Sequence, residues 1–252
     1  MDLGLKGKVA VVVGGSSNIG RACSLRLVEE GANVVIAYSS NDEKAKASLQ
    51  DMISAGGEGC AYSYKCDVTQ EDEVDSLFKF AIEKFNTVDI LIYSAMLWPT
   101  NKVIDMPLDE WNRTLEINLT GVFLTNRWLC KYWIDNNKPG KIMNFSSQAA
   151  FKGSTTFHAH YAAAKAGVVA FTVSLAKEVA KYGILVNSAA PGMTVSPGSM
   201  SEERMEYYKT RIPIGRCGTP AEMADIITFL VSPRNSYMLG ACVDVSGGML
   251  CR

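Results

Sequence analysis

The chain has 252 residues, of which 48% are hydrophobic and 20% charged, and its formal net charge is −1 at pH 7. That balance is typical of a globular protein with a sizeable core and makes nucleic acid or an anionic membrane an unlikely partner, and no apolar stretch reaches the ~18 residues of a membrane span. Seven cysteines are scattered without a C-x-x-C pair, which excludes a disulfide framework. This pattern and the presence of only two histidines disfavour a metal site. The reduced thiols and the lack of a signal-peptide pattern favour a cytoplasmic protein.

Hydrophobic periodicity predicts alternating strands and helices along the whole chain. Strands are expected at 8–13, 33–38, 60–64, 88–93, 141–145, 184–188 and 241–245, because these short segments are rich in apolar and β-branched residues. Helical patterns cover 21–30, 42–54, 70–85, 108–133, 161–182, 202–211 and 221–230. Since no polar linker interrupts this order, we expect an α/β fold in which a single domain, 1–252, is built on a doubly wound parallel sheet of the Rossmann type.

The first expected strand runs into Gly14-Gly-Ser-Ser-Asn-Ile-Gly20 and then directly into a helix. This order turns backbone N–H groups and the positive end of the helix dipole toward an anion, which indicates a phosphate-binding turn. Its glycine spacing is looser than the G-x-G-x-x-G fingerprint, so an ordinary strand–helix turn is the alternative interpretation. Asn18 stands where a middle glycine is expected, a tolerable change because Asn adopts positive φ more readily than most residues.

Polar or turn-forming residues follow several other expected strands. They are Tyr38-Ser39-Ser40, Asp67, Ser94-Ala95, Ser147 and Pro191-Gly192. In doubly wound sheets, ligands bind at the carboxyl ends of the strands, where the strand order reverses. We therefore expect one cleft there that holds a dinucleotide and a reacting group.

Tyr161 and Lys165 lie four residues apart on an expected helix and so share one face, one turn from each other. An isolated Tyr titrates near ~10, and a cation within ~4–6 Å favours its phenolate, which makes it a usable proton donor or acceptor. A half-buried Tyr beside a solvated Lys is the other interpretation of this common spacing. Because the helix begins on the same side of the sheet as Ser147, the expected cleft favours the chemical interpretation.

Taken together, these motifs resemble those of the short-chain dehydrogenase/reductase family over essentially the whole chain. Gly14 to Gly20 is similar to its Thr-Gly-x-x-x-Gly-x-Gly, Cys-Asp67-Val68 to its adenine-contacting Asp-Val, and Glu-Ile-Asn118-Leu to its Asn motif. Ser147, Tyr161 and Lys165 match its catalytic residues, and Pro191-Gly192 and the ending Val-Asp-Val-Ser-Gly-Gly248 match its closing pattern. The C-terminal third is most similar to 3-oxoacyl-carrier-protein reductases and related alcohol dehydrogenases.

The resemblance implies an NAD(P)(H)-dependent oxidoreductase that transfers a hydride between nicotinamide and a carbonyl or secondary alcohol. It implies Tyr161 as general acid and base, Lys165 as the group that lowers the Tyr pKa and holds the cofactor ribose, Ser147 as a hydrogen-bonding partner of the substrate oxygen, and Asn118 as support for a water chain. The cofactor-binding residues expected on this basis are Gly14, Ser16, Ser17, Asn18, Ile19, Gly20, Tyr38, Ser39, Ser40, Asp67, Val68, Ser94, Ala95, Met96, Tyr161, Lys165, Pro191, Gly192 and Thr194. It also implies a homo-oligomer, either a dimer or a tetramer.

Three departures from the family pattern bear on the walls of the cleft. Val13 replaces a Thr, Asn18 replaces the central Gly, and Tyr93-Ser-Ala-Met96 replaces Asn-Asn-Ala-Gly. A side chain at Met96, where the backbone usually passes close to the cofactor ribose, is expected to reshape that wall.

The choice of cofactor depends on the end of the second strand. A carboxylate there binds the ribose 2′-OH of NAD and repels the 2′-phosphate of NADP. Tyr38 occupies this position and no acid follows before Asp42, so we expect NADP(H) in preference to NAD(H), with Lys44 as the nearest cation.

The substrate is expected to be a small apolar or ring-containing carbonyl compound or alcohol. The residues expected to contact it are Trp98, Ser147, Gln148, His158, Tyr161 and Met193, with Phe151 and a lid over 196–208 around them. Two alternatives are a nucleotide-binding sensor with weak or no turnover and a cofactor-independent lyase. The joint presence of Asn118, Ser147, Tyr161 and Lys165 disfavours the sensor, and the intact glycine turn disfavours the lyase.

Overall fold

The computed structural model describes residues 1–154, 156–196 and 200–250, and its seven strands form one parallel sheet in the order β3-β2-β1-β4-β5-β6-β7. The strands are β1 (Val9–Val13), β2 (Asn33–Tyr38), β3 (Ala61–Lys65), β4 (Ile90–Tyr93), β5 (Gly140–Phe145), β6 (Ile184–Pro191) and β7 (Cys242–Val245). The order reverses between β1 and β4, which is where a doubly wound sheet opens a crevice for ligands. The predicted Rossmann-type α/β fold is confirmed.

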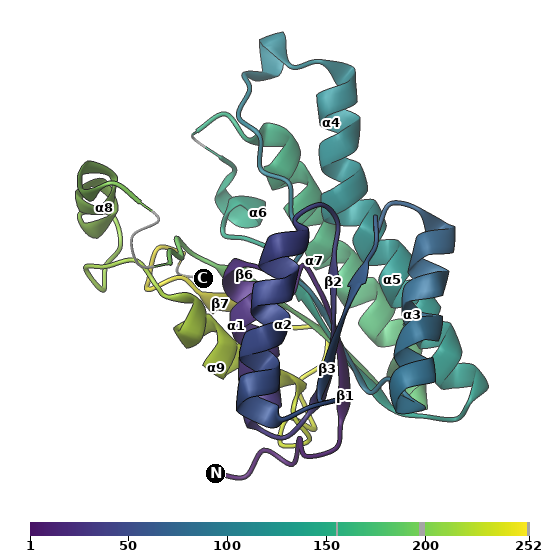
Figure 1. Ribbon diagram of the computed structural model, residues 1–252. Coiled ribbons are helices and arrows are strands. Elements are labelled where there is room, and N and C mark those ends of the chain that lie inside the picture. Colours follow the sequence, from purple (N-terminus) through teal and green to yellow (C-terminus); the bar gives the residue numbers. More distant parts are fainter. Residues whose placement is uncertain (155, 197–199, 251–252) are drawn as a thin grey trace.

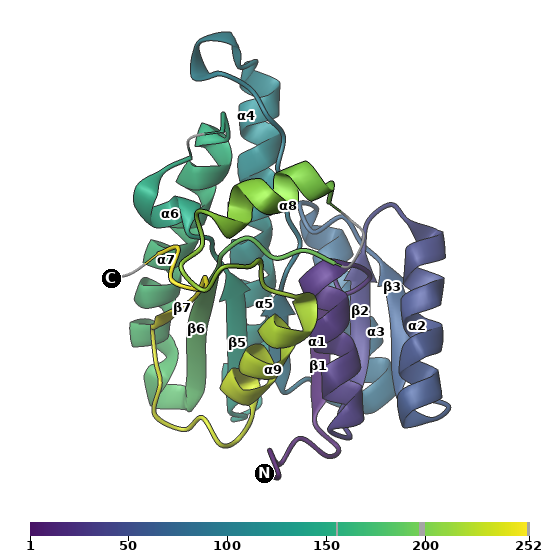
Figure 2. The same ribbon diagram turned by 90° about the vertical axis from the view of Figure 1, so that its left-hand side faces the viewer.

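Helices cover both faces of the sheet (Figure 1). The helices are α1 (Asn18–Glu29), α2 (Asp42–Gly56), α3 (Glu71–Phe85), α4 (Leu108–Leu115), α5 (Gly121–Asp135), α6 (Ala149–Lys152), α7 (Ala159–Val179), α8 (Glu202–Lys209) and α9 (Pro220–Val231). Helices α1, α2 and α9 lie on one face and α3, α5 and α7 on the other, while α4 rises beyond the carboxyl ends of the strands in both ribbon views (Figures 1 and 2).

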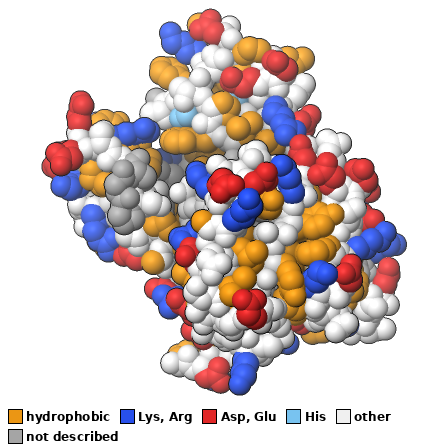
Figure 3. Space-filling view, in the orientation of Figure 1, with side chains coloured by type: hydrophobic (Ala, Val, Ile, Leu, Met, Phe, Trp, Pro, Cys, Tyr) orange, Lys and Arg blue, Asp and Glu red, His pale blue; other side chains and the backbone are white. Residues whose placement is uncertain are grey.

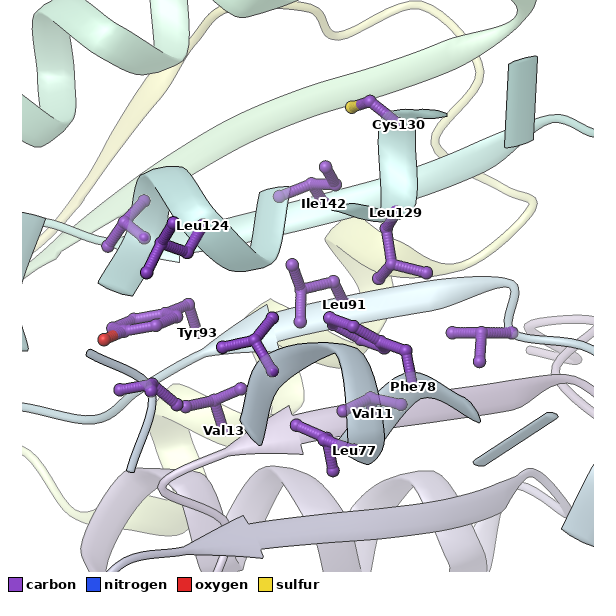
Figure 4. Packing of buried hydrophobic residues seen from close by; sticks show 14 of the residues in the cluster. Val11, Val13, Leu77, Phe78, Leu91, Tyr93, Leu124, Leu129, Cys130 and Ile142 are labelled. Carbon is purple, nitrogen blue, oxygen red and sulfur yellow. The ribbon is translucent and has the colours of Figure 1, made fainter. Parts of the chain in front are cut away.

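The two faces of β1 belong to two separate hydrophobic clusters. Val11 and Val13 pack with α3 and α5, as Figure 4 shows, whereas Ala10 and Val12 pack with α1 and α9. A strand buried on both faces reads as a continuous apolar run, because successive side chains point to opposite faces of the sheet. This burial explains the nearly continuous run of valines in β1.

The expected helix over 108–133 is not continuous. A π-helical turn, Glu116–Thr120, separates α4 from α5, and the Gly121 N–H donates to the Glu116 carbonyl oxygen five residues back. Such a turn inserts one residue into an α-helix and is frequent at functional sites. Here it contains Asn118.

The face of the molecule in Figure 3 carries acidic and basic side chains close to one another, and hydrophobic side chains gather between them near its centre. Among the described residues, no helix combines the length and apolar character needed to cross a bilayer. Cys23, Cys60, Cys66, Cys130 and Cys217 have free thiols, and Cys251 lies outside the described ranges.

Candidate active site

The glycine turn between β1 and α1 is packed too tightly for side chains at its two defining glycines. Gly14 has φ of +76°, and a Cβ atom there would lie 2.7 Å from the Ala95 backbone nitrogen. A Cβ on Gly20 would collide with the Gly14 carbonyl oxygen. Asn18 adopts φ of +46°, so it takes the left-handed conformation expected at this position.

The serines of the turn leave the first turn of α1 open to an anion. Ser17 is the N-cap of α1, and its side chain makes no capping hydrogen bond. The Ser16 carbonyl accepts from Ser48 Oγ at 3.1 Å, which ties α2 to the turn. Ile19 instead packs against the hydrophobic cluster beneath α1. A row of unsatisfied N–H groups at a helix start is the arrangement that binds phosphate.

The end of β2 carries a carboxylate, although not within the strand. Asp42, in the first turn of α2, accepts a hydrogen bond from the Tyr38 hydroxyl and pairs with Lys65 of β3 at 3.2 Å. Burial and this carboxylate raise the pKa of Tyr38. Ser39 and Ser40 are exposed beside it. The nearest acid is therefore neutralised by a lysine that sequence spacing did not indicate.

Asp67, which follows β3, is part of a polar cluster. One carboxylate oxygen accepts from the Thr69 N–H at 3.0 Å and from its hydroxyl at 2.8 Å, and the other pairs with Arg113 of α4 at 3.0 Å. Burial alone would raise the pKa of Asp67, but the bonds from Thr69 and Arg113 outweigh it and lower that pKa. Val68 turns into the core beside Gly121. Arg113 was missed because no local pattern links residues so far apart, whereas the Asp-x-Thr spacing is a recognisable turn signal.

The segment after β4 follows the sequence-based expectation only in part. The backbone of Ser94 and Ala95 lies against Gly14, and the Met96 side chain is 53% exposed. Tyr93, in contrast, is fully buried in the cluster with α3 and α5, and its hydroxyl donates to the Ile117 carbonyl at 2.6 Å. The Tyr93 departure from the family pattern therefore supports the π-helical turn from inside the core.

The side-chain amide of Asn118 is buried and fixes the segment that follows β4. Its Nδ2 donates to the carbonyl oxygens of Leu97 at 2.8 Å and Thr114 at 2.9 Å, and its Oδ1 accepts from the Leu97 N–H at 3.4 Å. Asn118 thus holds the backbone on which the neighbouring residue, Trp98, is carried.

Tyr161, Ser147 and Lys165 meet at the carboxyl end of β5. The Ser147 hydroxyl is hydrogen-bonded to the Tyr161 phenol, and Lys165 Nζ lies 5.5 Å from the centre of the Tyr161 ring. Lys165 is fully buried and donates to the Phe145 carbonyl at 2.7 Å. The neighbouring Ser146 points elsewhere, since its hydroxyl donates to the Lys165 carbonyl. Among the described residues, Ser147 is therefore the serine that faces the phenol.

Burial has a larger effect on the Tyr161 pKa in this structure than any neighbouring side chain. Burial raises the pKa of Tyr161 to about 12, although the hydrogen bond with Ser147 acts in the opposite direction. Burial also lowers the pKa of Lys165 to about 7. Both shifts have one cause: a charge enclosed by protein loses its hydration, which penalises the phenolate and the ammonium alike.

Trp98 and His158 join this cluster from two different segments. The two rings stack at 4.3 Å between centres, with 28° between their planes, and the Trp98 ring lies 6.4 Å from that of Tyr161. His158 Nδ1 is 2.6 Å from the Pro99 carbonyl oxygen. Of the expected substrate contacts, Trp98, His158, Ser147 and Tyr161 are thus brought together.

The remaining expected residues lie along the end of β6. Gly192 leaves no room for a side chain against Ser246, and Thr194 forms a backbone bridge with Gly218. Gln148 donates its N–H to the Pro191 carbonyl, and its buried Oε1 has no hydrogen-bonding partner among the described residues.

Met193 belongs to a separate cluster of side chains. It packs in a small cluster with Tyr208, Ile212 and Cys217, and it lines a cavity of about 520 Å³ between α9 and the segment after β7. No other expected substrate residue lines that cavity.

Residues 197–199 of the expected lid lie outside the described ranges. The described residues contain no group of three His, Cys, Asp or Glu side chains placed to hold a metal ion.

Known proteins match the chain over nearly its full length. A family model described as enoyl-(acyl carrier protein) reductase matches residues 13–250. The 3-oxoacyl-[acyl-carrier-protein] reductase of Synechocystis sp. is 37% identical over 98% of each chain, and that of Aquifex aeolicus is 35% identical over 99% of this chain and 100% of its own.

Solved structures agree with these relatives. A short-chain dehydrogenase from Bacillus anthracis superposes with a TM-score of 0.91 at 33% identity, covering 99% of this chain and 98% of its own. The actinorhodin polyketide ketoreductase with NADPH superposes with a TM-score of 0.89 at 30% identity, covering 96% of this chain and 97% of its own.

The fold and these likenesses define the class of protein, an NAD(P)-dependent oxidoreductase on a Rossmann-type sheet. Within that class, the chain belongs to the short-chain dehydrogenase/reductase family.

Proposed function

We propose that this protein reduces a ketone to a secondary alcohol with NADP(H), and that Tyr161 gives the proton to the substrate oxygen. The observation that carries the proposal is the meeting of Tyr161, Ser147 and Lys165 at the same edge of the sheet as the glycine turn. The curated relatives named 3-oxoacyl-[acyl-carrier-protein] reductases support the reaction class and make a 3-oxoacyl thioester the first substrate to assay.

The residues at the β1–α1 turn fit a dinucleotide. Gly14 and Gly20 leave space only for backbone, and Asn18 continues the left-handed conformation that the turn needs. In our proposal the N–H groups that open α1 hold the pyrophosphate, while Ser94 and Ala95 line the opposite wall. When bound, the nicotinamide supplies the hydride that the carbonyl carbon receives.

Tyr161 is suited to donate a proton. A phenol with a pKa of about 12 stays protonated at neutral pH. Reduction needs this protonated form as the proton donor, whereas oxidation needs the phenolate as the base. In our proposal Ser147 donates a second hydrogen bond to the substrate oxygen and orients it. Lys165, with a pKa of about 7, exchanges its proton readily near neutral pH and resupplies the phenol, and Asn118 holds the backbone at Leu97.

We propose NADP(H) over NAD(H), because Lys65 neutralises the carboxylate nearest to the end of β2. The NADPH named for the actinorhodin ketoreductase supports this preference.

We also propose that the protein is a cytoplasmic homo-oligomer, a dimer or a tetramer, which acts on a small molecule and binds neither nucleic acid nor membrane. Exposed apolar side chains on α4 and α5, Leu108 and Phe123, support the oligomer.

The test is the absorbance of NADPH and of NADH at 340 nm with 3-oxoacyl thioesters and ketones. We expect oxidation of NADPH with at least one carbonyl compound, at a higher kcat/KM than NADH gives. In Tyr161→Phe we expect kcat to fall by about 10²–10⁴-fold while NADPH binding, measured by calorimetry, is kept. Absence of binding to both dinucleotides would contradict the proposal.

A further inference from the structure

We propose that Trp98, held in place by His158, is a stacking platform that makes a planar ketone, aromatic or conjugated, the preferred substrate over an aliphatic one of equal size. This inference rests on the proposed reductase function. It goes further in assigning the substrate class to one side chain.

The Trp98 ring is only partly covered by its neighbours. His158 stacks on it at 4.3 Å, with the two planes 28° apart, while the residue as a whole remains 38% exposed. Its centre is 6.4 Å from that of the Tyr161 ring, whose plane is tilted by 59°. A flat molecule whose carbonyl oxygen reaches the Tyr161 hydroxyl therefore finds an aromatic surface directly beside it.

The backbone on both sides of Trp98 is fixed. Both polar groups of Leu97 are hydrogen-bonded to the Asn118 side chain. On the other side the Pro99 carbonyl lies 2.6 Å from His158 Nδ1, and because a carbonyl can only accept, Nδ1 must carry the hydrogen. The backbone before Trp98 is thus bound to the π-helical turn, and the backbone after it is bound to the residue that precedes α7.

A second connection holds His158 itself. The Asn101 N–H donates to the Phe157 carbonyl at 2.8 Å, and Asn101 and His158 form a parallel bridge. Phe157 has φ of +61°, a conformation that a bulky residue adopts only when its surroundings impose it. The Trp98 ring is therefore preorganised, so a substrate does not have to order it on binding.

A preorganised indole discriminates by shape and by π-electron distribution. Aromatic groups stack on such a ring in offset or edge-to-face geometry and gain more than their buried area alone gives. A flexible alkyl chain gains the area only and loses rotamer freedom. We expect a preference of about threefold to tenfold in kcat/KM for the planar ketone at equal size.

The experiment compares 2-tetralone and 2-decanone, which have the same number of carbon atoms, as ketone substrates with NADPH. In the wild type we expect the ratio of kcat/KM to favour 2-tetralone. Trp98→Leu should lower kcat/KM for 2-tetralone by a larger factor than for 2-decanone, so that the ratio falls to about one, and Trp98→Phe should keep part of the preference. An unchanged ratio in Trp98→Leu would overturn the inference while the reductase function stands.

His158 is proposed as a positioning residue, so its variants need a readout other than lost activity. His158→Phe keeps an aromatic ring under Trp98 and should retain most of the substrate ratio, whereas His158→Ala should lose it. Loss of the ratio in both variants, or in neither, would contradict the role of ring stacking.

Binding provides a readout that does not depend on turnover. 2-Tetralone should quench intrinsic tryptophan fluorescence, and Trp98→Phe should remove this quenching, whereas Trp128→Phe, on the distant α5, should not. If no ketone is turned over but the Trp98-dependent quenching is present, the reductase function fails and the platform stands. If quenching is the same in Trp98→Phe and the wild type, the platform is refuted.

Discussion

Lys165 shows what burial does to a single functional side chain. Its ammonium is enclosed by protein, has one hydrogen bond to the Phe145 carbonyl in this structure, and has a pKa of about 7. A pKa lowered this far from 10.5 corresponds to a cost on the order of a few kcal/mol for the charged form. A side chain that destabilises its own fold is expected where function requires it.

Lys165→Met should therefore stabilise the protein and inactivate it. Methionine fills a similar volume without a charge, so we expect Tm to rise by about 3 °C or more at pH 6 while reductase activity is lost. Between pH 7 and 10.5 the unfolded wild type binds one more proton at this residue than the folded wild type does. The unfolding free energy of the wild type therefore rises with pH relative to that of Lys165→Met, and the difference between the two proteins becomes smaller. Thermal unfolding at pH 6, 7.5 and 9 measures the difference, and parallel curves would contradict the burial argument.

The raised pKa of Tyr161 leads us to expect a different pH dependence for reduction and for oxidation. With a pKa of about 12 the phenol carries its proton through the neutral range, so the reduction rate should show no loss that is due to Tyr161 below pH 10. The oxidation rate, which needs the phenolate, should rise with pH across the same range. Initial rates at saturating cofactor from pH 6 to 10 test this, and an oxidation rate that peaks near pH 7 would refute it.

At the scale of elements, the π-helical turn, Glu116–Thr120, is where sequence-based prediction failed most clearly. One inserted residue leaves the apolar pattern of a long helix almost intact, so the periodicity of 108–133 did not reveal it. What supports the turn is a contact from another element, the Tyr93 hydroxyl on the Ile117 carbonyl. Gly121 leaves room for that hydroxyl, because a Cβ at this position would collide with it.

The Tyr93–Gly121 contact makes a double-mutant prediction. Tyr93→Phe should cost about 1–2 kcal/mol of unfolding free energy, since it leaves the Ile117 carbonyl without its partner. Gly121→Ala should also destabilise the protein, through the clash with the hydroxyl. Because the first change removes the clashing oxygen, the double variant should be more stable than the sum of the two losses predicts. Urea unfolding measures all three variants, and strict additivity would show that the contact does not couple them.

How far the sequence determined the site can be judged from particular residues. Local patterns sufficed for the strand–glycine–helix unit, for Asn18 at positive φ and for the shared face of Tyr161 and Lys165. They did not reveal the Arg113–Asp67 pair or the Trp98–His158 stack, which join segments distant in the chain. They also did not indicate that burial raises the Tyr161 pKa, because burial at this site depends on the packing of several elements.

At the scale of the whole molecule, the parallel sheet brings residues from seven strands to one edge, and the reductase proposal depends on that convergence. The exposed apolar side chains of α4 and α5 point to a further level of assembly. We expect light scattering coupled to gel filtration to give a mass of at least twice 27.4 kDa. A monomer at micromolar concentration would contradict the oligomer.

Transfer of the isotope label from NADPH deuterated at both C4 positions tests the central reaction most directly. With a ketone substrate, mass spectrometry of the alcohol should find one deuterium on the carbinol carbon in the wild-type product, formed about 10²–10⁴-fold more slowly in Tyr161→Phe. An alcohol without deuterium, or equal rates in the two proteins, would contradict hydride transfer assisted by the Tyr161 proton.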